Sequence, residues 1–140
     1  MEQGYWEHFE HDADMGLRAV ATTREALFET MGKALTAVVT DPAAVHAVEA
    51  VSISCEAPDD ALLLVDWLNA LIFEMATRGM VFGRWHVELS GQKLESRVEG
   101  EVVDRLRHQP VVEVKGATYT ALSVEQGSDG SWRCQCVVDV

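Results

Sequence analysis

Hydrophobic and polar residues alternate along the first part of the chain and change to a helical spacing after it. Residues 5–10 and 17–21 alternate with period two, as strands do, and the acidic turn 11–16 lies between them. This opening predicts a β-hairpin. Thr22 and Glu25 have the spacing of a capping box, which marks a helix start, and Asp41-Pro42 marks its end. The apolar stripe of this first helix consists of Leu27, Met31, Ala34, Leu35 and Val38.

A second and longer helix follows a short strand predicted at residues 50–55. It opens at Pro58-Asp59-Asp60 and runs to Arg78, just before Gly79. Beyond Gly79 the pattern returns to period two and predicts five strands, at residues 81–89, 93–102, 111–115, 118–125 and 132–139. The pattern therefore predicts an α+β fold in which two helices pack on an antiparallel or mixed β-sheet, in a single compact domain spanning residues 1–140.

The amino-acid composition disfavours some classes of binding partner and favours others. The chain has 140 residues, of which 48% are hydrophobic, so it can bury a substantial core. Asp and Glu number 23 against 11 Lys and Arg, and the net charge of −12 disfavours direct nucleic-acid binding while favouring cations and basic protein surfaces. The start lacks an apolar signal-peptide region, and no apolar run approaches the length of a membrane span. Three cysteines without CxxC spacing are typical of buried thiols in a reducing compartment, so we expect a cytoplasmic protein.

Two acidic segments could bind a hard cation. In the last strand Trp132, Cys134, Cys136 and Val138 share an apolar face, which places Asp139 on the outer face beside the terminal carboxylate of Val140. His11, Asp12 and Asp14 offer three potential ligands in the first turn. An EF-hand does not fit, because its glycine and glutamate would fall at Leu17 and Thr23. Taken alone, the last segment is better explained by a solvated chain end than by a metal site, and a capped turn is at least as good an explanation of residues 11–16 as metal binding.

The second helix and the histidines offer weaker signals. Asp66 and Asn69 lie on the side of the helix away from its core face, with Leu62 and Phe73 on the same stripe, for which ordinary burial is favoured over contact with a partner. The chain has no HExxH, GxSxG, P-loop or GxGxxG motif. His11 beside two carboxylates is more typical of a turn residue than of an acid–base catalyst.

Four blocks in order resemble the archease family and span almost the whole chain. They are WEHFEHDADMG at residues 6–16, LLVDWLN at 63–69, EVKGATY at 113–119, and the closing Asp139 followed by an aliphatic residue. The chain departs from the family pattern at three positions. Asp12 replaces a threonine and adds a charge to the turn, Gly116 replaces an alanine, and Thr120 stands where a histidine is frequent.

The resemblance implies a function that the residues alone do not give. It implies a non-catalytic, calcium-binding activator of the guanylylating RNA ligase of tRNA splicing and RNA repair, which promotes guanylylation and multiple turnover of that ligase. Asp14, Asp139 and Val140 match the calcium ligands, and other divalent cations are possible. The further residues that could extend this site or face the partner are His11, Asp12, Asp66, Asn69 and Lys115.

Two functions of other classes compete with this one. A metal-dependent hydrolase could use Asp12, Asp14 and Asp139, but it would need an open coordination position and a general base in a cleft. A general chaperone or scaffold would use the exposed side of the second helix as its contact surface. A hydrolase would turn over a phosphoester alone, whereas an activator would act only through its ligase.

Overall fold

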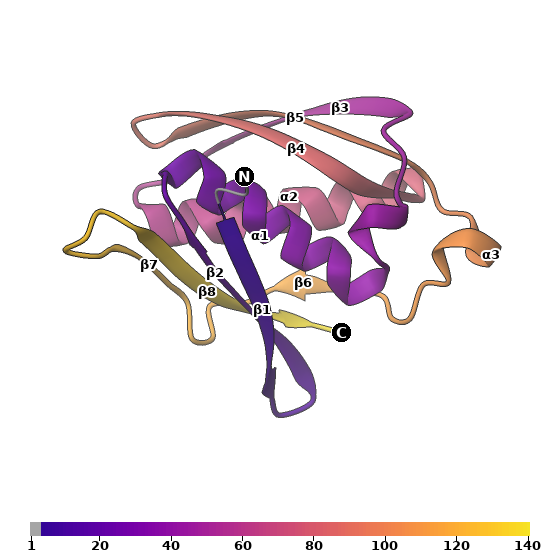
Figure 1. Cartoon of the computed structure of the whole chain (residues 1–140), viewed down its shortest axis with the longest axis horizontal. Helices are drawn as coiled ribbons and strands as arrows, with labels where there is room; N and C mark the ends of the chain where they lie inside the picture. Colours follow the sequence, from indigo (N-terminus) through magenta and orange to yellow (C-terminus); the bar gives the residue numbers. More distant parts are fainter. Residues whose placement is uncertain (1–3) are drawn as a thin grey trace.

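The computed structural model describes residues 4–140 and contains two antiparallel sheets with helices between them (Figure 1). The elements in chain order are β1 (Gly4–His11), β2 (Asp14–Ala21), α1 (Arg24–Val39), the 3-10 turn η1 (Pro42–Ala44), β3 (Glu49–Glu56), α2 (Asp60–Arg78), β4 (Met80–Ser90), β5 (Lys93–Val102), α3 (Arg105–His108), β6 (Gly116–Ala117), β7 (Ser123–Gln126) and β8 (Trp132–Asp139).

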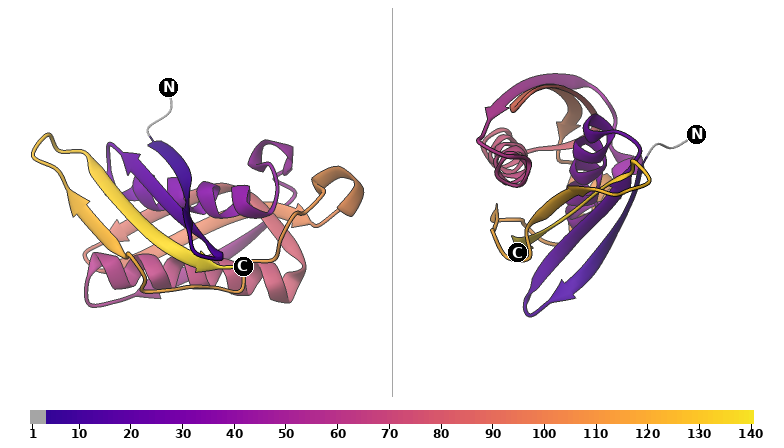
Figure 2. Two further views of the ribbon diagram at one scale, coloured as in Figure 1. Left: turned by 90° about the horizontal axis from the view of Figure 1, so that it is seen from below. Right: turned by 90° about the vertical axis from the view of Figure 1, so that its left-hand side faces the viewer.

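The strands divide into a sheet of five and a sheet of three. The first has the order β1-β2-β8-β6, with β7 pairing the other half of β8, and the second has the order β3-β5-β4. Helices α1 and α2 lie between these sheets and contact strands of both (Figures 1 and 2). The α+β prediction is confirmed, but the expected single sheet is wrong, because the two long helices separate the strands into two layers.

Local signals at the helix ends explain where the helices begin and end. The side chain of Asp59 accepts a hydrogen bond from Leu62 N at 2.8 Å, and Gly79 closes α2 with a left-handed φ of 63°. Both ends are as predicted. In α1 the cap is Thr23, whose Oγ1 accepts from Ala26 N at 3.0 Å. The predicted capping box of Thr22 and Glu25 is therefore wrong by one residue, although the whole predicted apolar stripe is buried.

Helix α1 joins the two sheets through polar contacts as well as apolar packing. His8 Nε2 of β1 lies 2.9 Å from the carbonyl of Ala34. On the other side, Thr36 donates to the carbonyl of Phe82 at 2.9 Å, and the Glu29 carboxylate accepts from Val87 N at 2.8 Å. These two contacts satisfy backbone groups along the free edge of β4. Burial raises the pKa of Glu29.

The strands predicted between β5 and β8 are largely wrong. Residues 111–115 form no strand, residues 118–125 contribute only the start of β7, and the unpredicted helix α3 is capped by the side chain of Asp104. The occupied edge of β8 explains this outcome, since β7 pairs with its first half and β6 with its last residues. An alternating sequence forms a strand only beside an edge whose backbone groups are unpaired, and this edge of β8 is already paired. Among residues 4–140, no helix is both long enough and apolar enough to cross a membrane.

Candidate functional site

The first hairpin projects from the body of the molecule and carries the acidic turn at its tip (Figures 1 and 2). His11 pairs with Asp14, so Asp12 and Ala13 alone form the turn. Asp12 adopts a left-handed φ of 52°, which aspartate tolerates better than most residues. Its side chain is 94% exposed and lies 3.8 Å from His11 Nδ1. The prediction of a hairpin is confirmed, and the Asp12 side chain is exposed to solvent.

Asp14 and Asp139 lie at the same end of the paired strands β2 and β8. The last pair of that register is Met15 with Val138, and Asp14 and Asp139 each adjoin this pair along their own strand. Opposite residues on antiparallel strands share a face, and their Cβ atoms lie about 5 Å apart. Val138 is fully buried, so alternation places both carboxylates on the outer face. His11 extends this row on β1, because it pairs with Asp14.

The end of the chain is held against the body of the protein. The side chain of Val140, which follows Asp139, packs against the core. The backbone N–H of Lys115 donates to the carbonyl of Asp139 at 2.8 Å, and Gly116 of β6 pairs with Asp139. The end of β8 is therefore paired by β6 as far as Asp139 on one side, and by β2 as far as Val138 on the other. The expectation of a frayed end does not describe this segment.

The outer face beside this row is fixed by a cluster that the sequence did not reveal. Gly16 lies directly under the Phe9 ring, and any larger side chain there would overlap that ring. The Arg18 guanidinium lies 4.4 Å from the Phe9 ring centroid, forms an ion pair with Glu7 at 2.9 Å and donates to Gln135 at 3.2 Å. These contacts join β1, β2 and β8 immediately next to Asp14. A glycine inside a strand was the available signal, since it marks a close approach.

Asn69 of α2 supports the same end of the sheet from its edge. Its Oδ1 accepts from Ala117 N at 2.8 Å, and its Nδ2 lies 3.5 Å from the Ala117 carbonyl. This amide therefore occupies the free edge of β6, which in turn pairs with Asp139. Asn69 is a positioning residue here, whereas the neighbouring Lys115 is exposed.

Asp66 is not brought into the row. It is exposed and lies close enough to Cys55 of β3 to add to the effect of burial, which raises the pKa of that thiol to about 11. Further along α2, Phe73 is 63% exposed, so the expectation that it is buried is wrong, whereas Leu62 packs against the core. The outward side of α2 is therefore partly apolar and open to solvent.

The donor set at the sheet end suits a hard cation but is short of ligands. Calcium prefers oxygen ligands such as carboxylates, and it coordinates six to eight oxygen atoms. Within the described part of the chain, no group of three or more His, Cys, Asp or Glu side chains lies close enough together to hold a metal ion. The row offers two carboxylate side chains, those of Asp14 and Asp139. Any remaining ligands would be water or groups from another molecule.

Known proteins share both the sequence and the fold of this chain. Residues 6–140 match the model of the archease protein family (MTH1598/TM1083). Protein archease of Methanopyrus kandleri is 40% identical over 139 residues, covering 96% of this chain and 99% of that one. Protein archease of Thermococcus gammatolerans is 35% identical over 139 residues, covering 96% and 98%.

Two solved structures have the same architecture. The solution structure of Methanobacterium thermoautotrophicum protein 1598 has a TM-score of 0.79 at 25% identity, with both chains fully covered. A Thermotoga maritima crystal structure, described as an archease and possible chaperone, has a TM-score of 0.66 at 18% identity, with 96% of each chain covered, and shows the fold alone. With four sequence blocks, a family model spanning nearly every residue and this shared fold, the chain belongs to the archease protein family.

Proposed function

We propose that this protein is a cytoplasmic, non-catalytic activator of a guanylylating RNA ligase in tRNA splicing and RNA repair, and that it acts through a calcium site at the end of the five-stranded sheet. Asp14 and Asp139 would hold the ion together with the terminal carboxylate of Val140. The observation that supports the proposal is the β2–β8 pairing, whose last pair, Met15 with Val138, adjoins both Asp14 and Asp139. Calcium bound there would neutralise carboxylates that otherwise repel each other.

The charge of the chain supports a protein partner over RNA. A net charge of −12 repels a phosphate backbone, so RNA would be bound by the ligase. The projecting hairpin carries the acidic turn between β1 and β2 at its tip, where it can reach a basic surface. Such a surface is expected in an enzyme that binds RNA and GTP. The proposal therefore assigns the hairpin tip to contact with the ligase.

A metal-dependent hydrolase is less well supported. Such an enzyme needs a cleft that excludes water around its metal and general base. The row of His11, Asp14 and Asp139 ends at the exposed rim of the sheet, and the groove of about 510 Å³ lies beside the C-terminal end of α2. His11 is directed toward the solvent-exposed Asp12. The row of acidic residues is therefore charged but open to solvent, and it lacks the enclosed cleft that a hydrolase needs.

The decisive experiment measures guanylylation of the cognate ligase and multiple-turnover ligation, with the ligase sub-stoichiometric to RNA. We expect wild-type protein to accelerate both, and Asp14→Ala and Asp139→Ala to lose most of that effect while staying folded. Glu10→Ala is the matched control, because it removes a carboxylate from the opposite face of the same hairpin. Protein without ligase should not hydrolyse a phosphodiester. Equal acceleration by wild type and both site variants would refute the proposed site.

A further inference from the structure

Strand β3 forms one edge of the three-stranded sheet. The sheet order is β3-β5-β4, and the pairing of β3 with β5 runs without a bulge from Glu49 to Glu56. One residue beyond it, Ala57 N donates to the Gln92 carbonyl at 3.3 Å. Because bonded pairs alternate along an antiparallel ladder, the odd-numbered residues of β3 bond to β5. The backbone groups that face the open edge therefore belong to the even-numbered residues, Ala50, Ser52, Ser54 and Glu56.

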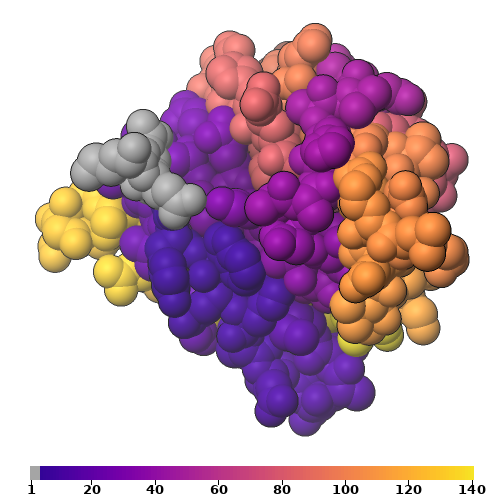
Figure 3. Space-filling view, turned by 45° about the vertical axis from the view of Figure 1, so that its right-hand side comes forward, coloured from indigo at the N-terminus to yellow at the C-terminus, as the bar shows by residue number. Residues whose placement is uncertain are grey.

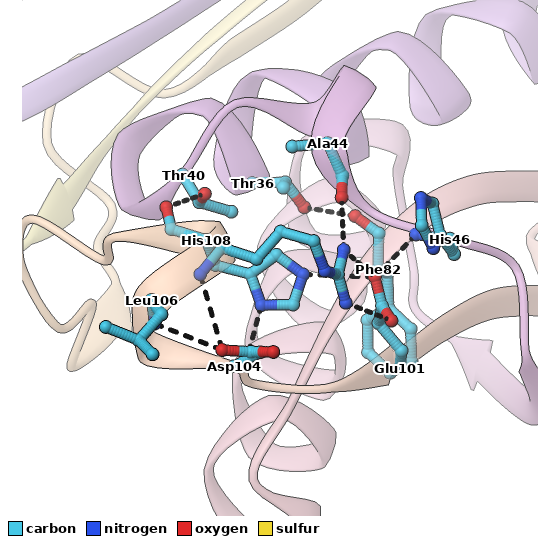
Figure 4. Close-up of polar contacts among 10 residues, drawn as sticks. Thr36, Thr40, Ala44, His46, Phe82, Glu101, Asp104, Leu106 and His108 are labelled. Carbon is cyan, nitrogen blue, oxygen red and sulfur yellow. Dashed lines mark hydrogen bonds and ion pairs between the residues drawn. The ribbon is translucent and has the colours of Figure 1, made fainter.

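The two edges of this sheet differ in how their backbone groups are satisfied. On β4, the Glu29 carboxylate accepts from Val87 N at 2.8 Å, and Thr36 donates to the Phe82 carbonyl at 2.9 Å (Figure 4). On β3, the four edge-facing residues are exposed, and their backbone groups have no hydrogen-bond partner among residues 4–140. Proteins commonly protect such an edge with proline, lysine or a bulge, and β3 has none of these. The edge of β3 is therefore open to pairing with another strand.

A buried polar network fixes the part of the chain that enters β3 (Figure 4). The Glu101 carboxylate accepts from two Arg107 nitrogens, at 2.6 and 2.8 Å, and from His46 N at 2.7 Å. Arg107 also donates to the Ala44 carbonyl at 2.8 Å. In Figure 3, residues 105–115, in orange, lie against the purple segment that leads into β3. The open edge therefore has a defined position before any partner binds.

The sequence of β3 is nearly symmetrical about Ile53. A serine flanks Ile53 on each side, and the apolar residues Val51 and Cys55 follow on the same face as Ile53. If two copies of β3 pair antiparallel with Ile53 opposite Ile53, all four edge-facing residues pair with one another. The pairs on the open edge are then Ser52 with Ser54 and Ala50 with Glu56. No other antiparallel register of two copies pairs all four, so the edge is complementary to itself.

We propose that a second copy of this chain pairs with this edge, joining two three-stranded sheets into one continuous sheet about a two-fold axis. A two-fold interface uses the same surface on both copies, so it requires a self-complementary edge. Each edge-facing residue then exchanges two main-chain hydrogen bonds with the other copy. Figures 1 and 2 show β3 and the β1–β2 turn on opposite sides of the molecule, so both rows of carboxylates stay free. The inference goes beyond the proposed function and does not depend on it.

The charges along this edge are compatible with pairing of two copies. The net charge of −12 opposes association, but the only charged residues of β3 are Glu49 and Glu56, at its two ends. In the proposed register both lie opposite alanines, so no like charges face each other. The exposed face of the neighbouring β5 carries two cations and two carboxylates, Lys93, Arg97, Glu95 and Glu99. Salt should strengthen the pairing by screening the net charge, whereas it would weaken binding of a basic ligase segment, the competing occupant.

Sedimentation equilibrium and hydrogen exchange of the full chain test the pairing. We expect dimers whose fraction rises with protein concentration and with salt. The even-numbered amides of β3 should exchange rapidly in dilute protein and become protected as dimers form, whereas the odd-numbered amides stay protected throughout. Ser54→Pro removes an edge-facing donor from each copy without breaking a bond to β5, and should weaken the dimer about thirtyfold. Ser54→Ala is the matched control, since it loses the hydroxyl bond to Glu95 but keeps the donor.

Cross-linking tests the register itself. Position 51 lies opposite Cys55 of the other copy in a non-hydrogen-bonded pair, which is close enough for a disulfide. Within one chain these positions are about 13 Å apart and cannot bond. With oxidised glutathione, Val51→Cys should therefore form covalent dimers on a non-reducing gel, and Val51→Cys combined with Cys55→Ser should not. Ser128→Cys, exposed in the turn between β7 and β8, controls for random collision.

The outcomes decide between the possible occupants of the edge. Dimers with protected even-numbered amides and a Val51→Cys cross-link support the inference. Monomers at every concentration, or dimers in which these amides exchange rapidly and Ser54→Pro has no effect, overturn it. Protection that appears only with the cognate ligase and is weakened by salt assigns the edge to the ligase and also overturns it. If Ser54→Pro fails to fold, the cross-link and the wild-type amides still decide, and no outcome bears on the ligation assay.

Discussion

Replacing Asp139 with asparagine should change stability in opposite directions with and without calcium. Asp14 and Asp139 both adjoin the Met15–Val138 pair that ends the β2–β8 register, and the spacing of opposite Cβ atoms on antiparallel strands, about 5 Å, sets the scale of their separation. Their repulsion is about 3 kcal/mol at an effective dielectric of about 20 and about 0.8 kcal/mol in bulk water. Because Asp139 is exposed, the lower part of that range applies. In calcium-free buffer, Asp139→Asn should therefore be more stable than wild type by about 1 kcal/mol, or about 3 °C in Tm.

Calcium should reverse this order. At a calcium concentration about 100 times its Kd, wild type gains about 2.7 kcal/mol, and each tenfold loss of affinity in the variant removes about 1.4 kcal/mol of that gain. Thermal unfolding in EGTA and in a calcium series measures both effects. Glu10→Gln is the control, since it removes one charge from the opposite face of the hairpin and should keep the calcium shift. A variant that is less stable in EGTA and keeps the full calcium shift would refute the reasoning.

Three further outcomes test the fold around the site. Gly16→Ala should destabilise the protein by about 1–3 kcal/mol in urea unfolding, because its methyl group overlaps the Phe9 ring; an unchanged midpoint would contradict that packing. Hydrogen bonds from Arg107 hold the pKa of Glu101 well below its usual value of 4.5. The Glu101 carboxylate therefore adds to the free energy of unfolding above pH 4.5, and this stabilisation is lost as the pH falls below that value. The urea midpoints of Glu101→Gln and wild type should differ more at pH 7 than at pH 3, and an equal difference would count against this network. Burial raises the pKa of Cys136 to about 11, so only about one thiol in a thousand is ionised at pH 8, and iodoacetamide should label it only after unfolding; rapid labelling of folded protein would disprove its burial.

Local features of the fold could be predicted from sequence, and features that depend on distant partners could not. Asp59 and Gly79 fix the ends of α2 through their own side-chain and backbone chemistry, so both were predictable. Two consecutive threonines offer the same capping group, and only packing selects Thr23. The strand prediction at residues 111–115 failed because alternation reports which side chains favour burial, and β8 had no free edge to pair with them.

The candidate site also combines a feature that the local sequence predicts with features that depend on distant parts of the chain. The outer-face position of Asp139 followed from alternation along the last strand, since Cys134 and Cys136 are buried as predicted. Its placement near Asp14 could not follow from any local pattern, because the two residues lie near opposite ends of the chain and only the pairing of β2 with β8 brings them to the same end of the sheet. The family resemblance implied both as ligands before the register was known. Neither approach pointed to Asn69 as a support for β6, because its role depends on where α2 meets that edge.

An incomplete donor set has a thermodynamic consequence for the proposed function. Three carboxylates supply at most six oxygens, and only if each binds through both, so calcium at this row would retain water or accept ligands from the ligase. If the ligase supplies a ligand, calcium must raise the affinity for the ligase by the same factor by which the ligase raises the affinity for calcium. The rigid face formed by Phe9, Gly16 and Arg18 favours such coupling, because carboxylates that are already positioned lose little conformational freedom when the ion binds. Calcium would therefore bind weakly to the free protein and tightly only at the interface with the ligase. An activator that must bind its ligase and then dissociate requires this property.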